Sequence, residues 1–375
     1  MKRLRITGLR VYPVVQQGPG QSRHFLFVRL DTEDRDIYGL GEATLRVKTP
    51  AVIEALRLLD SRVRGMSVFS AEELFYRYFH HDRWRNGVIM NTALAAVETA
   101  MYDAAGKLLD VPVYNLLGGR LRDSVPLYVH GWDRIPENVA LGFRAFKTDP
   151  IPWSAGAGPL RNEVPQGGVE AALEALGRAR ETAGPDLELL VECHARFHYD
   201  QALEFIRACE PYRTAFVEEP LQPDDWNGWK KLSRRANVPL AGGERLFTRF
   251  GYRKVLEAGL LSIAQPDFTH SAGLMEAKKL SAMADAYYVR VAPHNSSGPM
   301  ATIASVHVDA TLSNLYRQEY IQQTTFEDFF VDPPRIEGGS VVLDDARPGL
   351  GLVPDWERIE SLTTRGPIEE GTDDW

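Results

Sequence analysis

This chain has fewer basic than acidic residues. Its 375 residues include 43 lysines and arginines against 51 aspartates and glutamates, which gives a formal net charge of −8. No cluster of basic residues is present that could displace counterions from a nucleic-acid backbone. The composition therefore argues against a protein that binds nucleic acid through its phosphates. No apolar run approaches the ~20 residues of a membrane-spanning helix, and the basic N-terminus lacks the apolar stretch of a signal peptide. We therefore expect a cytoplasmic protein with neither nucleic-acid nor membrane partners.

Cysteine is almost absent. The chain has 2 cysteines, Cys193 and Cys209, without CxxC spacing, which excludes a disulfide-stapled scaffold and favours buried, reduced thiols. A GxGxxG sequence after an early strand is also missing, so the pattern does not indicate a dinucleotide-binding fold of the Rossmann type.

Two apolar patterns divide the chain. Up to residue 122 the pattern predicts three strands (5–15, 24–32 and 37–44) and then three helices (51–65, 70–81 and 91–110), which is typical of a separate α+β domain. From residue 123, short apolar strands alternate with amphipathic helices, so the sheet should be parallel. Eight such strands fit a closed α/β barrel better than an open sheet. They are expected at 125–131, 144–149, 187–195, 214–220, 238–244, 261–268, 288–295 and 314–320.

Polar residues gather at the carboxyl ends of these strands, where barrels build their active sites. They are Glu192, His194, Glu218, Glu244, Asp267, His294 and Glu319. The three glutamates at 192, 218 and 244 are each 26 residues apart, about one strand–helix unit, so their carboxylates should converge above the barrel. Unpaired, these charges would repel one another, whereas Mg²⁺ takes oxygen ligands and keeps positions for water or substrate. The spacing therefore predicts one Mg²⁺ ion per subunit.

Two histidines accompany these carboxylates. Asp267 and His294 end adjacent strands, and a carboxylate bonded to one imidazole nitrogen raises the basicity of the other. Glu192 and His194 are two residues apart, so alternation along the strand should place both on the inward face and Cys193 against the helices. We expect His294 and His194 to belong to one site.

Alternation makes two further predictions. Lys147 and Asp149 are also two residues apart and could share the inward face, where Asp149 is a candidate substrate contact. Glu219 should point away from its neighbour Glu218 and meet a basic side chain near the rim of the barrel.

Three loops are candidates for covering the barrel mouth. The segments 16–24 and 80–88 should reach it from the N-terminal domain, and Trp84 and Arg85 are candidate substrate contacts. The Gly/Pro-rich segment 151–168 is long enough to be a lid.

As a set, these motifs resemble the enolase superfamily, and within it the mandelate racemase-like subgroup of acid-sugar enzymes. The resemblance covers nearly the whole chain and includes the segments ALAAVETAMYDAAGKLLDVPVYNLLGG and GGERLFTRF. It implies a (β/α)7β TIM-like barrel over residues 123–335, an N-terminal α+β capping domain over residues 1–122, and a C-terminal segment, 336–375, that returns to the cap. It also implies a homo-oligomer.

The resemblance assigns roles to the rim residues. The three spaced glutamates would hold Mg²⁺, although the subgroup usually has aspartate where this chain has Glu192. His294, poised by Asp267, would remove the C2 proton of a sugar acid. Glu319 would hydrogen-bond the substrate carboxylate or the ene-diolate formed from it.

The second histidine would select the reaction. Sugar-acid dehydratases of the galactonate, mannonate and gluconate type carry a histidine two residues after the first metal ligand, and it protonates the departing C3 hydroxyl. His194 has this position. Racemases of the subgroup usually carry Lys-x-Lys on the second barrel strand, where this chain reads Lys147-Thr148-Asp149. The resemblance thus implies a dehydratase that yields a 2-keto-3-deoxy sugar acid, with Lys147 among its catalytic residues.

Other interpretations stay open at this point. An epimerase, racemase or cycloisomerase of the same superfamily could use the same base and metal without losing water. A non-catalytic homologue could bind sugar acids without turnover. A glycosidase with paired carboxylates would need neither three ligands in even register nor the histidine–aspartate pair.

Overall fold

The chain begins with an antiparallel hairpin of two long strands, β1 (Ile6–Gln17) and β2 (Ser22–Thr32), to which β3 (Tyr38–Glu42) is added. The computed structural model describes residues 3–17, 22–85, 87–152, 164–322 and 326–364. The predicted loop 16–24 is wrong in its extent, because the ladder continues to the pair Gln17–Ser22 and satisfies the backbone groups on both sides. The tip of the hairpin, 18–21, lies outside the described residues.

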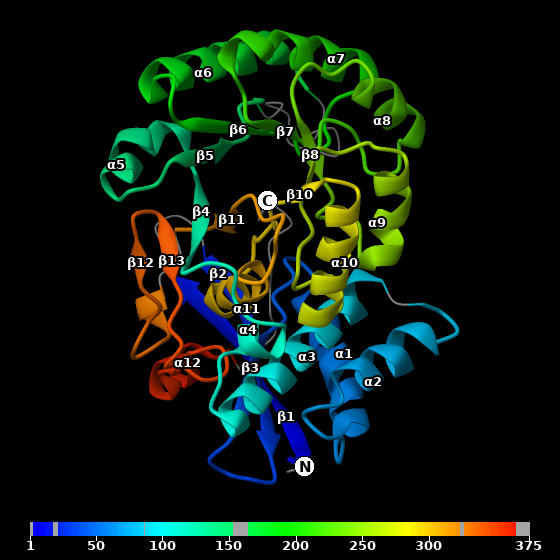
Figure 1. Ribbon diagram of the computed structural model, residues 1–375, viewed down its shortest axis with the longest axis vertical. Helices are drawn as coiled ribbons and strands as arrows, with labels where there is room; N and C mark the ends of the chain where they lie inside the picture. Colours follow the sequence, from blue (N-terminus) through cyan, green and yellow to red (C-terminus); the bar gives the residue numbers. More distant parts are fainter. Residues whose placement is uncertain (1–2, 18–21, 86, 153–163, 323–325, 365–375) are drawn as a thin grey trace.

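Helices follow the sheet and lie with it in the lower half of Figure 1. They are α1 (Thr49–Val63), α2 (Ala71–Phe75), the π-helical turn η1 (Tyr76–His80) and α3 (Val88–Leu109). Strand β3 packs directly on the backbone of α3. A Cβ on Gly39 or Gly41 would stand 1.8 or 2.1 Å from the carbonyl oxygen of Ala100 or Ala96, so only glycine permits this approach. In the described part of the chain, no helix is long and apolar enough to cross a membrane.

Within the described residues, eight parallel strands and seven intervening helices form a barrel, coloured from teal at β4 through green and yellow to orange at β11 in Figure 1. A short helix, α4 (Val113–Leu116), precedes it. The strands are β4 (Ser124–His130), β5 (Ala145–Thr148), β6 (Glu188–Glu192), β7 (Phe216–Glu218), β8 (Leu240–Gly242), β9 (Ile263–Ala264), β10 (Arg290–Val291) and β11 (Gln318–Tyr320). The helices are α5 (Ile135–Ala140), α6 (Gly168–Ala183), α7 (Tyr199–Ala208), α8 (Trp226–Ser233), α9 (Thr248–Glu257), α10 (Leu274–Ala286) and α11 (Pro299–Asp309).

The barrel is closed. Neighbouring strands pair in parallel from β4 to β10, and β11 pairs with β4 on the other side. Between β10 and β11, the backbone N–H of Tyr316 donates to the carbonyl of Val291 at 2.7 Å, which completes the ring. The predicted (β/α)7β barrel is confirmed.

A plug of side chains fills the barrel below its mouth. Its members are Tyr128, Ala145, Leu190, Phe216, Ala241, Ile263 and Ala292, one from each of seven strands or strand ends. Because side chains alternate along a strand, the residue two positions later faces inward again. Six of the seven plug residues are followed in this way by a polar residue, namely His130, Lys147, Glu192, Glu218, Gln265 and His294. The inward-facing residues therefore form a polar layer directly above the apolar plug.

The C-terminal segment returns to the N-terminal sheet. A hairpin of β12 (Ile336–Glu337) and β13 (Ser340–Val342) pairs with β4, and α12 (Trp356–Leu362), red in Figure 1, follows. The rings of Tyr12 on β1 and Trp356 on α12 are 5.2 Å apart, and Val14 bridges Thr363. The division at residues 122 and 335 and the homo-oligomeric assembly stay predictions, and residues 365–375 lie outside the described part.

Two buried carboxylates tie the N-terminal elements to barrel helices. Glu98 of α3 accepts hydrogen bonds from the backbone N–H groups of Leu274 (2.6 Å) and Met275 (3.1 Å), and Glu42 accepts one from Gly298 (2.6 Å). These donors begin α10 and precede α11, where helical N–H groups have no partner within the helix. Burial raises the pKa of Glu42 to about 7 and that of Glu98 to about 8.

The raised pKa of Glu98 predicts a loss of stability as pH rises from 4.5 to about 8. Its folded-state pKa of about 8 lies above the ordinary 4.5, so the folded protein retains a proton that the unfolded chain loses, and the free energy of unfolding falls as pH rises through this window. Glu98→Gln cannot ionise. Its destabilisation relative to the wild type, about 1–3 kcal/mol at pH 5 for the imperfectly matched N–H groups, should shrink towards pH 9 in urea unfolding experiments.

Glu54→Gln provides the control, because Glu54 is 67% exposed on α1. Its unfolding free energy should match the wild type at each pH. If the deficit of Glu98→Gln were the same at pH 5, 7 and 9, the buried carboxyl would be ionised in the folded protein and the prediction would fail.

Candidate active site

Three glutamates converge at the mouth of the barrel. Glu192 and Glu218 end β6 and β7 as register partners, and Glu244 follows β8. Each offers a carboxylate oxygen, and these oxygens lie within 4.8 Å of one another. Burial, and next the charge of Glu218, raise the pKa of Glu192 well above its usual range. The structure therefore brings the three residues of the predicted metal site together.

The donor set fits a hard divalent cation. All three ligands are carboxylates, the oxygen donors that Mg²⁺ takes. Glu218 Oε1 is buried and has no hydrogen-bond partner among the described residues, which is unfavourable unless another group fills that role. A cation among the carboxylates would do so. Glu192 has one methylene more than the aspartate expected at this position of the family. One of its oxygens, Oε1, accepts a hydrogen bond from the backbone N–H of His194 at 2.6 Å.

Lys147 lies against this cluster, with its side chain only 3% exposed. Its Nζ is 2.9 Å from Glu218 Oε2, 2.6 Å from Glu319 Oε1 and 3.7 Å from Glu192 Oε2. Burial alone would lower the pKa of Lys147, but Glu218 and then Glu319 raise it well above its ordinary value. This lysine is therefore the built-in counter-ion of the carboxylates.

The Glu319 carboxylate on β11 is surrounded by hydrogen-bond donors. Its Oε1 lies 2.6 Å from His130 Nε2, and its Oε2 accepts a hydrogen bond from the backbone N–H of Asn295 at 2.7 Å. Burial opposes the charge, but Lys147, followed by the hydrogen bond to His130, holds the pKa of Glu319 well below its usual range. His130 is a site residue that sequence reasoning missed, although its signal was present: it ends β4 as the other polar residues end their strands.

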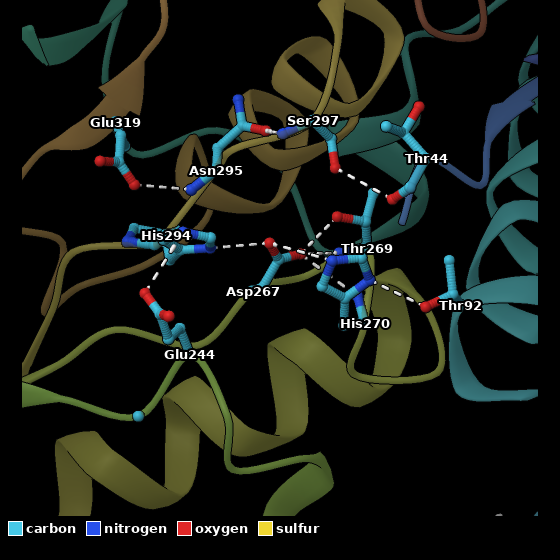
Figure 2. A network of polar contacts seen from close by, with 12 residues as sticks. Thr44, Thr92, Glu244, Asp267, Thr269, His270, His294, Asn295, Ser297 and Glu319 are labelled. Atoms are coloured by element: carbon cyan, nitrogen blue, oxygen red, sulfur yellow. Dashed lines mark hydrogen bonds and ion pairs between the residues drawn. The ribbon is translucent and has the colours of Figure 1, made fainter. Parts of the chain in front are cut away.

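His294 and Asp267 form the predicted pair. His294 Nδ1 is 2.8 Å from Asp267 Oδ2, and His294 Nε2 is 3.3 Å from Glu244 Oε2, as Figure 2 shows. Burial alone would lower the pKa of His294, but Glu244 and the hydrogen bond to Asp267 raise it to about 10. A cation held by Glu244 would oppose that rise, because positive charge near the ring disfavours the imidazolium.

Asp267 is itself held in place by neighbouring residues on the side away from His294. The backbone N–H of Thr269 donates to Asp267 Oδ1 at 2.8 Å, and His270 Nε2 lies 3.6 Å from Oδ2. His270 Nδ1 is in turn 2.8 Å from Thr92 Oγ1, on α3 of the N-terminal part (Figure 2). No sequence pattern links Thr92 to the strand ends of the barrel, so this support was not predicted.

His194 lies beside Asp149, just past β6. The predicted extension of that strand to residue 195 is wrong, because β6 ends at Glu192 and His194 adopts φ 46°, in the left-handed region. Strand alternation therefore does not place His194. Its Nδ1 is 2.7 Å from Asp149 Oδ2, and its side chain is 48% exposed. Cys193 is buried in the apolar layer between strands and helices rather than in the plug, as predicted.

Glu219 confirms the prediction for the outward-facing glutamate. Its Oε2 is 2.6 Å from Arg245 Nη2, so the basic partner near the rim is Arg245. This pairing explains how β7 can end in Glu218 with a second glutamate directly after it: the carboxylate of Glu218 faces the candidate metal site, and that of Glu219 is neutralised by Arg245.

The segments expected to cover the mouth are described only in part. Arg85 lies over the rings of Phe79 and Phe250, 5.2 and 5.6 Å from their centroids, which places it beside the first turn of α9. Trp84 is 86% exposed. Substrate contacts of Trp84 and Arg85 stay predictions. Residues 18–21, 86 and 153–163 of the predicted covering loops lie outside the described part.

Comparisons with known proteins cover both parts of the chain. Residues 133–358 match the family described as enolase C-terminal domain-like, and residues 13–118 match the N-terminal domain of mandelate racemase/muconate lactonizing enzyme. The D-galactonate dehydratase of Cronobacter sakazakii is 32% identical over 367 residues, 94% of this chain and 92% of the relative. The D-gluconate/D-galactonate dehydratase of Picrophilus torridus is 32% identical over 370 residues, 93% of this chain and 90% of the relative.

Solved structures that match this chain over nearly its whole length are also named as enolases. An enolase from Pantoea ananatis with bound D-gluconate and Mg has a TM-score of 0.87 at 25% identity, over 97% of this chain and 96% of its own. An enolase from Agrobacterium radiobacter with bound Na and L-malate has a TM-score of 0.85 at 28% identity, over 98% of both chains.

Metal affinity tests the three-glutamate site. Glu218→Gln removes one charged ligand and should weaken Mn²⁺ binding, followed by electron paramagnetic resonance, by more than the roughly 10–100-fold seen when only a supporting partner of a ligand is lost. Glu219→Gln is the matched control on the next residue and should bind Mn²⁺ like the wild type. Equal losses in both variants would show that strand integrity, not ligation, is being measured.

Proposed function

The chain belongs to the mandelate racemase/muconate lactonizing enzyme family of the enolase superfamily, and from its site we propose that it is a Mg²⁺-dependent dehydratase of a sugar acid. One observation carries the proposal: two histidine–aspartate pairs flank the three glutamates. His294 and Asp267 follow β10 and β9, whereas His194 and Asp149 follow β6 and β5, four strands away in a ring of eight. Opposite sides of the barrel mouth thus carry a candidate base and a candidate acid.

The names of the relatives support an aldonate as the substrate class. They include dehydratases of D-galactonate and D-gluconate, and one structural neighbour holds D-gluconate together with Mg. Such a substrate has a carboxylate, a C2 proton next to it, and a hydroxyl on C3 that can leave.

Glu192, Glu218 and Glu244 would hold the Mg²⁺ ion. When bound there, the ion would stabilise the negative charge that develops on the substrate carboxylate as the C2 proton leaves. Lys147 offsets part of the negative charge of the cluster from the side of the barrel core, which lets Glu218 and Glu319 stay ionised while buried.

His294 would take the C2 proton at Nε2. Asp267 holds Nδ1, which fixes the orientation of the ring and leaves Nε2 directed towards Glu244 and the place of the substrate. A base positioned in this way contributes roughly 10²–10⁴-fold to the rate.

His194 would act at C3, the carbon that carries the departing hydroxyl. As the electron pair of the C2–H bond moves towards C3, the C3–O bond breaks, and His194 gives a proton to the hydroxyl so that it departs as water. Hydroxide is a poor leaving group, so this step needs an acid. The resulting enol takes up a proton at C3 and becomes the 2-keto-3-deoxy acid.

Glu319 receives a different role from the one that the resemblance implies. A carboxyl group can donate to the substrate carboxylate only while it is protonated, and the donors around Glu319 favour its ionised form: Lys147 Nζ is 2.6 Å from Oε1, and the backbone N–H of Asn295 donates to Oε2 at 2.7 Å. We assign it to holding Lys147 and His130 in place, through contacts of 2.6 Å to each.

The same contacts argue against racemisation. A racemase needs a second base opposite His294, and Lys147 would be the candidate by its position on β5. Its Nζ is buried and pairs with Glu218 and Glu319, so it is neither neutral nor exposed to a substrate. The observed pairs therefore favour loss of water over inversion at C2.

Turnover tests the proposal directly. D-Galactonate, D-gluconate and a panel of other aldonates and aldarates are incubated with the protein and Mg²⁺, and 2-keto acids are detected as semicarbazones. At least one acid should be dehydrated, with activity lost in EDTA and restored by Mg²⁺. His294→Asn should lower kcat by roughly 10²–10⁴-fold while retaining Mn²⁺ binding. Full turnover by this variant, or in excess EDTA, would contradict the mechanism.

A further inference from the structure

Asp149 lies one residue past β5 and contacts two cationic or potentially cationic side chains. Its Oδ2 is 2.7 Å from His194 Nδ1 and 2.6 Å from Arg196 Nη2. Its Oδ1 also accepts a hydrogen bond from the backbone N–H of Ile151 at 2.9 Å, and lies 2.5 Å from the same guanidinium nitrogen. The carboxylate is thereby fixed in position and in rotation.

Arg196 provides the anchor. Its side chain is only 1% exposed, and Nη2 also donates to the carbonyl of Ile151 at 2.9 Å, within the segment that follows Asp149. A guanidinium buried to this degree needs a charged partner, because removing charges from water is otherwise unfavourable. Arg196 thus neutralises Asp149 and holds it against the ring of His194.

Asp149 faces one edge of the His194 ring, the edge that carries Nδ1. With Nδ1 facing Asp149, the opposite nitrogen, Nε2, lies on the far edge of a side chain that is 48% exposed. The backbone of the same residue is fixed by the hydrogen bond from its N–H to Glu192 and by its left-handed φ of 46°. This repeats the arrangement of Asp267 and His294 in Figure 2, where a carboxylate also holds Nδ1 at 2.8 Å.

We infer that Asp149 is a positioning residue for His194: anchored by Arg196, it orients the imidazole so that Nε2–H meets the departing C3 hydroxyl. The inference rests on the proposed dehydration and deepens it. It also gives a reason for aspartate at this position of the second barrel strand, where a lysine could not accept a hydrogen bond from the ring.

Asp149→Asn tests this role, because the variant keeps the size of the side chain and removes its charge. Two rates are measured with D-galactonate or D-gluconate in D₂O: formation of the 2-keto acid, and entry of deuterium at C2 of recovered substrate. Removal of the C2 proton needs only His294 and the metal site. We therefore expect dehydration to fall by about 10²-fold while exchange at C2 continues, so that the ratio of exchange to dehydration rises by a similar factor.

His194→Gln should raise the same ratio, and the double variant should lose little more than either single variant, because both changes disable one acid. Glu276→Gln is the structural control. It breaks another buried ion pair, with Arg249, whose backbone N–H also donates to Glu276 at 2.9 Å. This variant should be less stable, yet its ratio should equal that of the wild type.

Parallel loss of exchange and dehydration in Asp149→Asn would overturn the inference, since it would show that the residue only maintains the fold of the site. Additive losses in the double variant would overturn it as well. A wild-type protein that exchanges the C2 proton but never forms a keto acid would instead overturn the proposed dehydration, and a wild type that does neither would overturn both.

Discussion

Repulsion among carboxylates at the barrel mouth is the constraint on which the site depends. Glu192, Glu218 and Glu244 approach within 4.8 Å of one another in a place that is largely shielded from water. Like charges so close cannot all persist without compensation. The chain itself supplies part of the compensating positive charge through Lys147, which pairs with Glu218 and Glu319. The remaining excess negative charge faces the open end, where a divalent cation would bind and where a substrate carboxylate would be received.

Much of this arrangement could be predicted because it follows from a short-range rule. Parallel strands of equal register, each ending in a polar residue, must bring those residues to one rim, and the even spacing of the three glutamates encodes that rule. The rule fails where the strand stops, because His194 adopts a left-handed conformation that alternation cannot anticipate. Asp149, a predicted substrate contact, instead pairs with His194. Lys147 was correctly placed on the inward face, but its role depends on contacts with β7 and β11 that spacing does not specify.

The support behind the two histidines differs in origin. His194 depends on neighbours from its own side of the barrel, because Asp149 and Arg196 come from the segments that follow β5 and β6. His294 depends on Asp267, which a second histidine, His270, connects to Thr92 of the N-terminal part (Figure 2). Such long-range contacts form only when the two parts pack together, and the buried carboxylates of Glu42 and Glu98 stabilise that packing at the starts of α11 and α10. The N-terminal part thus contributes to the site as well as lying next to it.

The location of the cation tests the central claim most directly. Crystals grown with Mn²⁺ allow the ion to be identified by its anomalous scattering, independently of activity. The account predicts one peak at the barrel mouth, with oxygens of Glu192, Glu218 and Glu244 at about 2.0–2.6 Å, the range of hard divalent cations, and with Lys147 still paired with Glu218 and Glu319. A map without a peak between these three carboxylates, or with the ion bound elsewhere while they repel one another into solvent, would contradict it.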